Sequence, residues 1–190
     1  MEKLAIVFPG MGYHADKPLL YYSKKMARSM GYKIIDLSYQ GFPKPEKESE
    51  ESMMQIFEIA KQQTEEQLKE IDGSKALDLL FLSKSVGTIV AVDYAYRHQL
   101  SPKFVLYTPL RETFRVMKQE KINAIAFHGT KDGWADTKIL QQGCKEHDIP
   151  LHLIEQGNHS LESQDILYDI RKLQSVMQIT HEFLLDNENH

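Results

Sequence analysis

Six short apolar segments, separated by stretches with helical periodicity, constrain this chain more than any other feature of its sequence. Each segment is a nearly continuous run of apolar and β-branched residues, without regular alternation of apolar and polar positions. Strands buried on both faces have this composition, which is typical of parallel sheets covered by helices. We therefore predict a doubly wound α/β fold, with a mainly parallel six-stranded sheet flanked by helices in one domain over residues 1–190. The predicted strands are residues 4–8, 33–37, 77–82, 104–107, 123–127 and 151–154.

Two of the intervening stretches carry amphipathic helical patterns. In both, apolar residues recur mostly at three- and four-residue steps, as on one face of a helix. We expect these apolar stripes to face the core, with the second forming a long last helix across the sheet. The stripes consist of Met53, Phe57, Ala60, Thr64, Leu68 and Ile71, and of Ile166, Ile170, Leu173, Met177 and Leu184.

The composition argues against several classes of protein. The chain has 190 residues and a net charge of −4 with no basic stripe, so we expect no nucleic-acid partner. No segment reaches the roughly 18 apolar residues that a membrane span needs, and the run at residues 4–8 is too short for a signal peptide. We therefore expect a cytoplasmic protein with no membrane span, whose oligomeric state the sequence leaves open.

The only cysteine, Cys144, excludes an internal disulfide and a multi-cysteine metal site. It lies in a predicted helix over residues 136–147, where we interpret it as a structural thiol. The histidines outside the loops discussed below show no metal-ligand spacing, so we predict no metal site. These histidines are His98, His147, His152, His181 and His190.

The third apolar run leads directly into a turn of small residues, and a helical pattern follows at once. Strand, sharp turn and helix in this order are what a nucleophile elbow requires, with small residues two positions before and after the nucleophile. Ser85 takes the nucleophile position, with Gly87 after it and Ser83 before it, giving an S-x-S-x-G pattern. We interpret Ser83 as a packing position. By itself the motif is weak, because a serine that caps the following helix would give the same pattern.

Two further loops supply the groups that a serine nucleophile needs. Asp132 follows the fifth predicted strand, and His159 follows the sixth. In a parallel sheet these loops lie at the same edge, where ligands bind. A histidine can take the proton of the serine hydroxyl, and a carboxylate on the other ring nitrogen orients that histidine. We therefore expect Ser85, His159 and Asp132 to meet as nucleophile, base and orienting acid.

With its candidates in the order Ser85, Asp132, His159, the sequence resembles the α/β-hydrolase superfamily over nearly its whole length. Residues 8–12, Phe-Pro-Gly-Met-Gly, are similar to the family's oxyanion loop, with Pro9 in place of the frequent histidine. The resemblance implies that the backbone N–H groups of Met11 and Val86 form an oxyanion hole. It also implies that the first two strands of the family are missing, and that residues 108–113 leave no room for a lid.

The resemblance implies a serine hydrolase that cleaves an ester, thioester or related acyl bond of a small-molecule substrate through an acyl-enzyme, without a cofactor. Two other functions stay open: a non-catalytic binding protein of the same fold, and an acyltransferase of that fold. A flavodoxin-like nucleotide binder is disfavoured, because the first loop has no G-x-G-x-x-G run.

Other polar residues have competing interpretations. Asp136 could serve as the acid in place of Asp132, but its position suits a helix N-cap better. Glu112 is a weaker alternative for the acid. His128, at a strand end before a glycine, is interpreted as a structural hydrogen-bonding histidine.

Four residues near the predicted site are candidates for substrate contact. Tyr13 and His14, in the first loop, could line the substrate entrance. Arg111 and Arg115 could contact an anionic substrate, although a solvated helix face explains them more simply.

Overall fold

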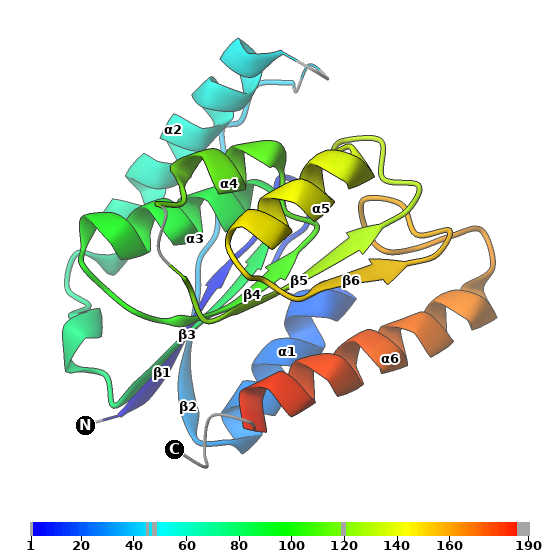
Figure 1. The fold of residues 1–190 in the computed structure, drawn as a ribbon. Coiled ribbons are helices and arrows are strands. Elements are labelled where there is room, and N and C mark those ends of the chain that lie inside the picture. The colour runs from blue at the N-terminus through cyan, green and yellow to red at the C-terminus, as the bar shows by residue number, and fades with distance from the viewer. Residues whose placement is uncertain (1, 45, 47–48, 119–120, 186–190) are drawn as a thin grey trace.

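The computed structural model describes residues 2–44, 46, 49–118 and 121–185, and these form one parallel six-stranded sheet with helices on both faces (Figure 1). Every strand pair is parallel, and the order across the sheet is β2-β1-β3-β4-β5-β6. The predicted fold class is confirmed. The strands are β1 (Lys3–Phe8), β2 (Tyr32–Asp36), β3 (Asp78–Lys84), β4 (Lys103–Tyr107), β5 (Ala124–Gly129) and β6 (Leu151–Ile154).

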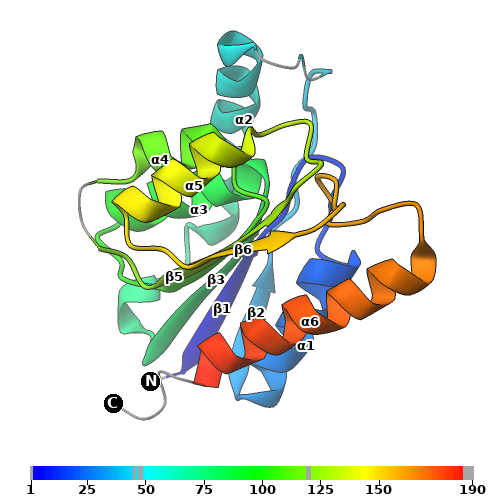
Figure 2. The same ribbon diagram turned by 45° about the vertical axis from the view of Figure 1, so that its right-hand side comes forward.

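Helices cover the sheet in two layers, each with its own apolar core. Figures 1 and 2 show α1 and α6 together on one face and the other four α-helices on the opposite face. The β-strand side chains alternate between these layers, so each face of the sheet is apolar and buried. The helices are α1 (Pro18–Ser29), α2 (Glu50–Leu68), α3 (Val86–Arg97), α4 (Arg111–Val116), α5 (Thr137–Glu146) and α6 (Ile166–Leu185), and a 3₁₀ turn spans Gly73–Lys75.

The burial predicted for the two amphipathic stripes is confirmed on α2 but only in part on α6. The stripe on α2 is largely confirmed, since Phe57, Ala60, Thr64 and Leu68 are buried. On α6 the prediction is wrong for the first turns: Ile166 is 75% exposed and Ile170 57% exposed.

The buried residues of α6 lie further along the helix, at Val176, Thr180 and Leu184. The physical reason is visible in Figure 1, where the first turns of α6 extend beyond the edge of the sheet and have no strand to cover. Periodicity marks an apolar face but does not say how far the partner surface reaches.

The chain reverses its direction across the sheet next to β1, and this reversal positions the candidate site. From β1 the chain moves outward to β2, then returns past β1 to β3 and continues in the opposite direction. The loops that follow β1 and β3 therefore diverge at the carboxyl edge of two neighbouring strands, the place where open α/β sheets bind ligands. No helix among the described residues is both long and apolar enough to cross a membrane.

Candidate active site

Ser85 occupies a strained turn between β3 and α3. Its φ is +55° and its ψ is −126°, a backbone conformation that costs a non-glycine residue about 1–3 kcal/mol. The Ser85 N–H donates to the carbonyl of Tyr107, 3.0 Å away, which ties the turn to β4. At Gly87 a Cβ would lie 2.2 Å from the Phe8 carbonyl oxygen, so only glycine allows the turn to approach the end of β1 this closely.

The structure brings Ser85, His159 and Asp132 into one hydrogen-bonded chain. Oγ of Ser85 lies 2.8 Å from Nε2 of His159, and Nδ1 of His159 lies 2.7 Å from Oδ2 of Asp132. In the tautomer that carries its proton on Nδ1, the imidazole donates to the carboxylate and accepts from the serine hydroxyl. The Ser85 side chain makes no capping hydrogen bond to α3, so the capping interpretation of this serine is wrong.

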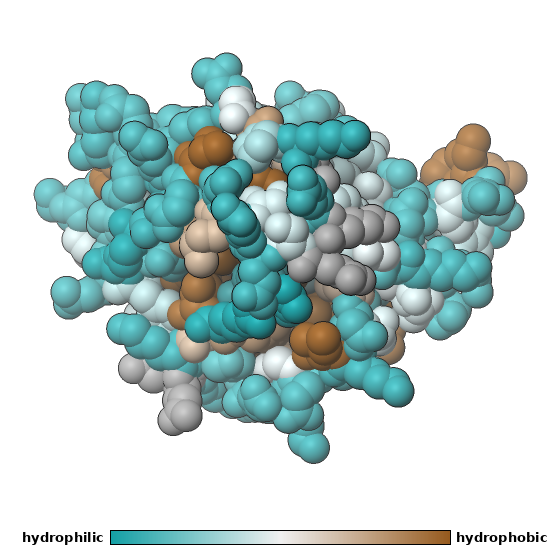
Figure 3. All heavy atoms as spheres, turned by 90° about the horizontal axis from the view of Figure 1, so that it is seen from above, coloured by the Kyte–Doolittle hydropathy of each residue, from teal (hydrophilic) through white to brown (hydrophobic). Residues whose placement is uncertain are grey.

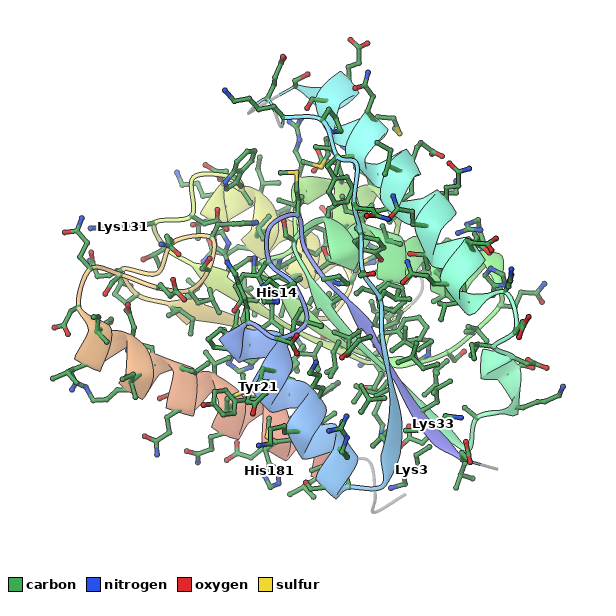
Figure 4. All side chains as sticks on the ribbon, turned by 180° about the vertical axis from the view of Figure 1, so that it is seen from behind. Lys3, His14, Tyr21, Lys33, Lys131 and His181 are labelled. Carbon is green, nitrogen blue, oxygen red and sulfur yellow. The ribbon has the colours of Figure 1, made fainter. Side chains whose placement is uncertain are left out.

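The loops that carry Asp132 and His159 pack directly on each other. A Cβ on Gly129 would lie 2.2 Å from the carbonyl oxygen of Gly157, which makes glycine necessary at this contact. The Lys131 N–H donates to that same carbonyl. Oδ1 of Asn158 accepts from the Ser160 N–H at 2.7 Å, which shapes the backbone around the histidine. Figure 4 shows Lys131 of the first loop extending away from the body of the protein.

Electrostatics keep this chain of groups in the state that proton transfer requires. Burial alone would raise the pKa of Asp132, but the hydrogen bond and charge of His159 and the Trp134 N–H outweigh it, so the pKa is lowered. Burial lowers the pKa of His159 below its usual 6.5, although its hydrogen bond to Asp132 opposes this. At neutral pH the pair is therefore a carboxylate and a neutral imidazole.

His128 lies beside the carboxylate of Asp132. Its Nδ1 lies 3.6 Å from Oδ2 of Asp132, and its Nε2 lies 3.0 Å from the Thr137 hydroxyl. Burial lowers the pKa of His128, which favours the neutral ring. The geometry agrees with the structural role predicted for this histidine.

The two backbone donors predicted for the oxyanion hole have no protein acceptor. Among the described residues, no backbone or side-chain oxygen accepts a hydrogen bond from the N–H of Met11 or Val86. Val86 is the first residue of α3, where helices leave their N–H groups free. Met11 lies within a turn closed by two hydrogen bonds between Gly10 and Tyr13, of 3.1 and 3.2 Å.

The alternatives to Asp132 have other partners. The carboxylate of Asp136 caps α5 by accepting from the N–H groups of Lys138 and Ile139, as the N-cap interpretation predicted. Glu112 forms an ion pair with Arg111 at 2.7 Å.

The two arginines considered as substrate contacts both lie near Glu50. Arg111 is 3.3 Å and Arg115 is 3.0 Å from the same oxygen of that carboxylate. Their charges are therefore matched by acidic partners on α2 and α4, as expected for a solvated face.

A hollow of about 360 Å³ lies on one side of the His159 loop, between the starts of α1 and α6. It is mostly apolar, and the exposed residues Ile166 and Ile170 at the start of α6 form part of its wall. In Figure 3 a group of apolar side chains projects at the right-hand edge of the molecule, where α6 begins and its exposed apolar residues lie. The other apolar residues of the wall are Tyr13, Leu19, Leu161, Leu173 and Val176.

A second hollow, of about 560 Å³, lies beside the Asp132 loop and has more polar walls. Trp134 lines it, and the ring of Trp134 lies 6.2 Å from the ring of His159. Leu110 and Ile139 also line it. The hydrogen-bonded chain is thus flanked by one apolar and one mixed hollow. The connection from β4 to α4 is short, residues 108–110, and holds no lid.

The structure places the two predicted entrance residues differently. Tyr13 is 5% exposed and lines the apolar hollow. His14 is exposed on the loop between β1 and α1, where Figure 4 labels it, and its Nδ1 accepts from the Asp16 N–H.

The sequence pattern predicted no role for Lys84, which lies between Ser83 and Ser85 in the elbow motif, or for Trp134. Lys84 is 1% exposed and is the last residue of β3, directly before Ser85. The sequence signal for Lys84 is its spacing: it lies two and four residues after Leu82 and Leu80, so its side chain is on the same buried face of β3 as theirs.

The remaining titratable candidates fit no ligand site. No group of three or more histidine, cysteine or acidic side chains with the arrangement of a metal site occurs in the described part of the chain, and His190 lies outside that part. Cys144 is buried on α5, and burial raises the pKa of its thiol to about 12, which fits a structural thiol.

Comparison with solved structures identifies the fold. Est1E from Butyrivibrio proteoclasticus, in a structure with bound ferulic acid, matches with a TM-score of 0.67 at 12% identity, over 99% of this chain and 90% of that one. An α/β serine hydrolase homologue from Coxiella burnetii matches with a TM-score of 0.65 at 13% identity, over 96% and 85%. A lidless α/β serine hydrolase from Xanthomonas campestris matches with a TM-score of 0.60 at 13% identity, over 95% and 80%.

This chain therefore has the α/β-hydrolase fold, as the sequence resemblance implied. At the level of sequence, no protein-family model and no curated protein matches it.

Proposed function

We propose that this protein is a serine hydrolase that cleaves an ester, thioester or related acyl bond of a small molecule through an acyl-enzyme. The observation that carries the proposal is the hydrogen-bonded chain from Ser85 Oγ through His159 to the buried Asp132, at 2.8 and 2.7 Å. The strained backbone at Ser85 supports it, because such conformations persist where function needs them.

The chemistry divides into two acyl transfers. Nε2 of His159 takes the proton of Ser85 as Oγ bonds to the carbonyl carbon, and the Asp132 carboxylate stabilises the imidazolium. The N–H groups of Met11 and Val86 donate to the oxyanion. When this intermediate collapses, the bond to the leaving group breaks, and His159 returns its proton to that group. A water molecule then gives a proton to His159 and attacks the acyl-enzyme. When this second intermediate collapses, the bond to Ser85 Oγ breaks, His159 returns the proton to Oγ, and the acid is released.

The two hollows suggest how a substrate would lie. The apolar hollow begins at Tyr13 and at Ser160, next to His159, so an aliphatic acyl chain extending from Ser85 would enter it. The mixed hollow beside Trp134 would hold the leaving group. Both are open to solvent, which favours short and medium acyl chains over long lipids. No step of this proposed reaction uses a metal ion or an organic cofactor.

Labelling with a fluorophosphonate probe tests the proposal. We expect wild-type protein to be labelled and the Ser85→Ala variant to remain unlabelled with an unchanged circular dichroism spectrum. Ser83→Ala is the matched control: Ser83 is fully buried and donates to the Val105 carbonyl at 3.0 Å, so this variant should still label. Folded wild-type protein that does not label would favour a non-catalytic binding protein instead.

Product analysis then separates hydrolysis from transfer. Short p-nitrophenyl esters and acyl-thioesters should release free acid at the same rate with or without added alcohols and thiols. Formation of new esters or thioesters at the expense of free acid would identify an acyltransferase.

A further inference from the structure

Lys84 is a buried cation directly before the candidate nucleophile. Its side chain has the same parity on β3 as Leu80 and Leu82, so it enters the layer that α1 and α6 cover. The residue is only 1% exposed, and its ammonium forms no ion pair and no hydrogen bond within the described residues. Its one specific contact is the ring of Tyr13, whose centroid lies 4.9 Å from Nζ.

This arrangement is unfavourable for folding. A buried charge without an ionic partner loses its hydration, and a contact with an aromatic face returns only part of that loss. Burial accordingly lowers the pKa of Lys84 to about 7. A methionine would occupy similar space without this penalty. Groups that lower stability and sit at an active site are candidates for a role in activity.

Tyr13 connects the lysine to a proposed oxyanion donor. The backbone of Tyr13 closes the Gly10–Tyr13 turn through two hydrogen bonds, and Met11 lies inside that turn. The Tyr13 hydroxyl accepts from the N–H of Leu19 at 3.1 Å, which anchors the far end of the ring on α1. The stem of Lys84 also packs on the turn, since a Cβ on Gly10 would lie 3.5 Å from its Cγ.

We propose that Lys84 is a positioning residue: its ammonium, seated on the Tyr13 ring, holds the Gly10–Tyr13 turn against the elbow, so that the Met11 and Val86 N–H groups converge on one oxygen. This inference rests on the proposed hydrolase function. Lys84 is bonded to Ser85 along the chain, and its side chain contacts the turn through the Tyr13 ring and at Gly10.

The charges around Lys84 come from three other parts of the chain. Asp132 after β5 and Glu162 in the His159 loop favour the ammonium form, and Lys17 beside α1 disfavours it. The pKa of His159 is lowered mainly by burial, and the positive charge of Lys84 lowers it further. The hydrogen bond to Asp132 acts in the opposite direction. The cation thus acts on the oxyanion turn by contact and on the base through space.

Four single variants and one double variant test the inference, with p-nitrophenyl acetate as substrate. We expect Lys84→Met to lower kcat by about 10- to 100-fold, the size of effect that misplacing one group by about 1 Å produces. KM should change by less than about twofold, and Tm should be unchanged or higher. Tyr13→Leu should lower kcat similarly, and the double variant should be no worse than either single one, because the two residues act as a unit.

Lys84→Arg and Lys17→Met complete the design. Lys84→Arg keeps a cation, so its kcat should lie between those of Lys84→Met and wild type. In wild type, deprotonation of Lys84 should lower kcat/KM between about pH 7 and 8.5. The Lys84→Arg variant should show no such decline. Lys17→Met is the matched control, because Lys17 also lies over the Tyr13 ring, at 5.3 Å, but on the surface side. It should keep wild-type kcat.

Three results would overturn the inference. One is wild-type kcat in Lys84→Met. Another is a loss of kcat accompanied by a lower Tm, which indicates a structural role alone. The third is an equal loss in Lys17→Met. If the wild-type protein neither reacts with the fluorophosphonate probe nor hydrolyses esters, both the proposed function and this inference are wrong. If the wild-type protein is labelled and the Lys84→Met variant is fully active, only this inference is wrong.

Discussion

Asp132 and His159 form a buried, directional pair: the fully buried carboxylate places Oδ2 2.7 Å from Nδ1 of the imidazole. An isolated carboxyl group at such a site would take up a proton, because burial penalises its charge. Here the His159 hydrogen bond and the Trp134 N–H, 2.8 Å from Oδ1, outweigh burial. The carboxylate therefore stays ionised and leaves Nε2 of the ring free to accept from Ser85.

Replacing Asp132 tests this pair directly. Asp132→Asn should lower kcat by about three to four orders of magnitude with the fold intact, because the amide favours the wrong imidazole tautomer. The measurement is steady-state hydrolysis of p-nitrophenyl acetate, with circular dichroism as the check on folding. Asp136→Asn is the matched control: it changes an N-cap on α5 and should leave kcat within a few-fold of wild type. If the two variants exchanged these effects, Asp136 would be the acid.

The pH dependence follows from the lowered pKa of His159. The imidazole must be neutral to accept the serine proton, so kcat/KM falls when the pH drops through the His159 pKa. Since burial holds that pKa below the ordinary 6.5, the acid limb should have its midpoint below pH 6.5. In Lys84→Met the midpoint should move upward, because a nearby positive charge has been removed. A wild-type midpoint above 6.5 would contradict the electrostatics described for the site.

Much of this architecture was predictable because its signals are local. Six apolar runs predicted the strands, and the turns after β3, β5 and β6 contained Ser85, Asp132 and His159. Strand ends were less well predicted: β3 continues to Lys84, past the predicted end at Leu82, because its last residues pair with β4.

What the sequence did not predict depends on distant packing. The exposure of Ile166 and Ile170 depends on where the sheet ends. The contact between Lys84 and Tyr13 joins the end of β3 to the loop after β1, which are far apart in the chain. Helical periodicity and motif spacing carry no information about either relationship.

Lys84 should leave a signature in the pH dependence of stability. Its pKa is about 7 in the folded protein and about 10.5 when unfolded, so between these values the unfolded state binds more protons. The free energy of unfolding should then rise with pH, by up to about 1.4 kcal/mol per unit, relative to Lys84→Met. Below about pH 7 both states are protonated and the penalty is complete, so Lys84→Met should exceed wild type in stability most clearly there. Urea titrations from pH 6 to 9 measure the difference, and parallel curves would show that Lys84 is charged in both states.

The apolar hollow between α1 and α6 predicts a chain-length preference. Each methylene buried there contributes up to about 0.8 kcal/mol, so kcat/KM should rise by up to about threefold to fourfold per methylene from acetate to hexanoate. Ile170→Trp should fill the hollow and abolish this rise while acetate hydrolysis stays near wild type, since Ile170 is a half-exposed wall residue. Ile139→Trp is the matched control in the other hollow: it should leave the chain-length series unchanged and disfavour bulky leaving groups. A chain-length series that responds to Ile139→Trp and not to Ile170→Trp would place the acyl group beside Trp134.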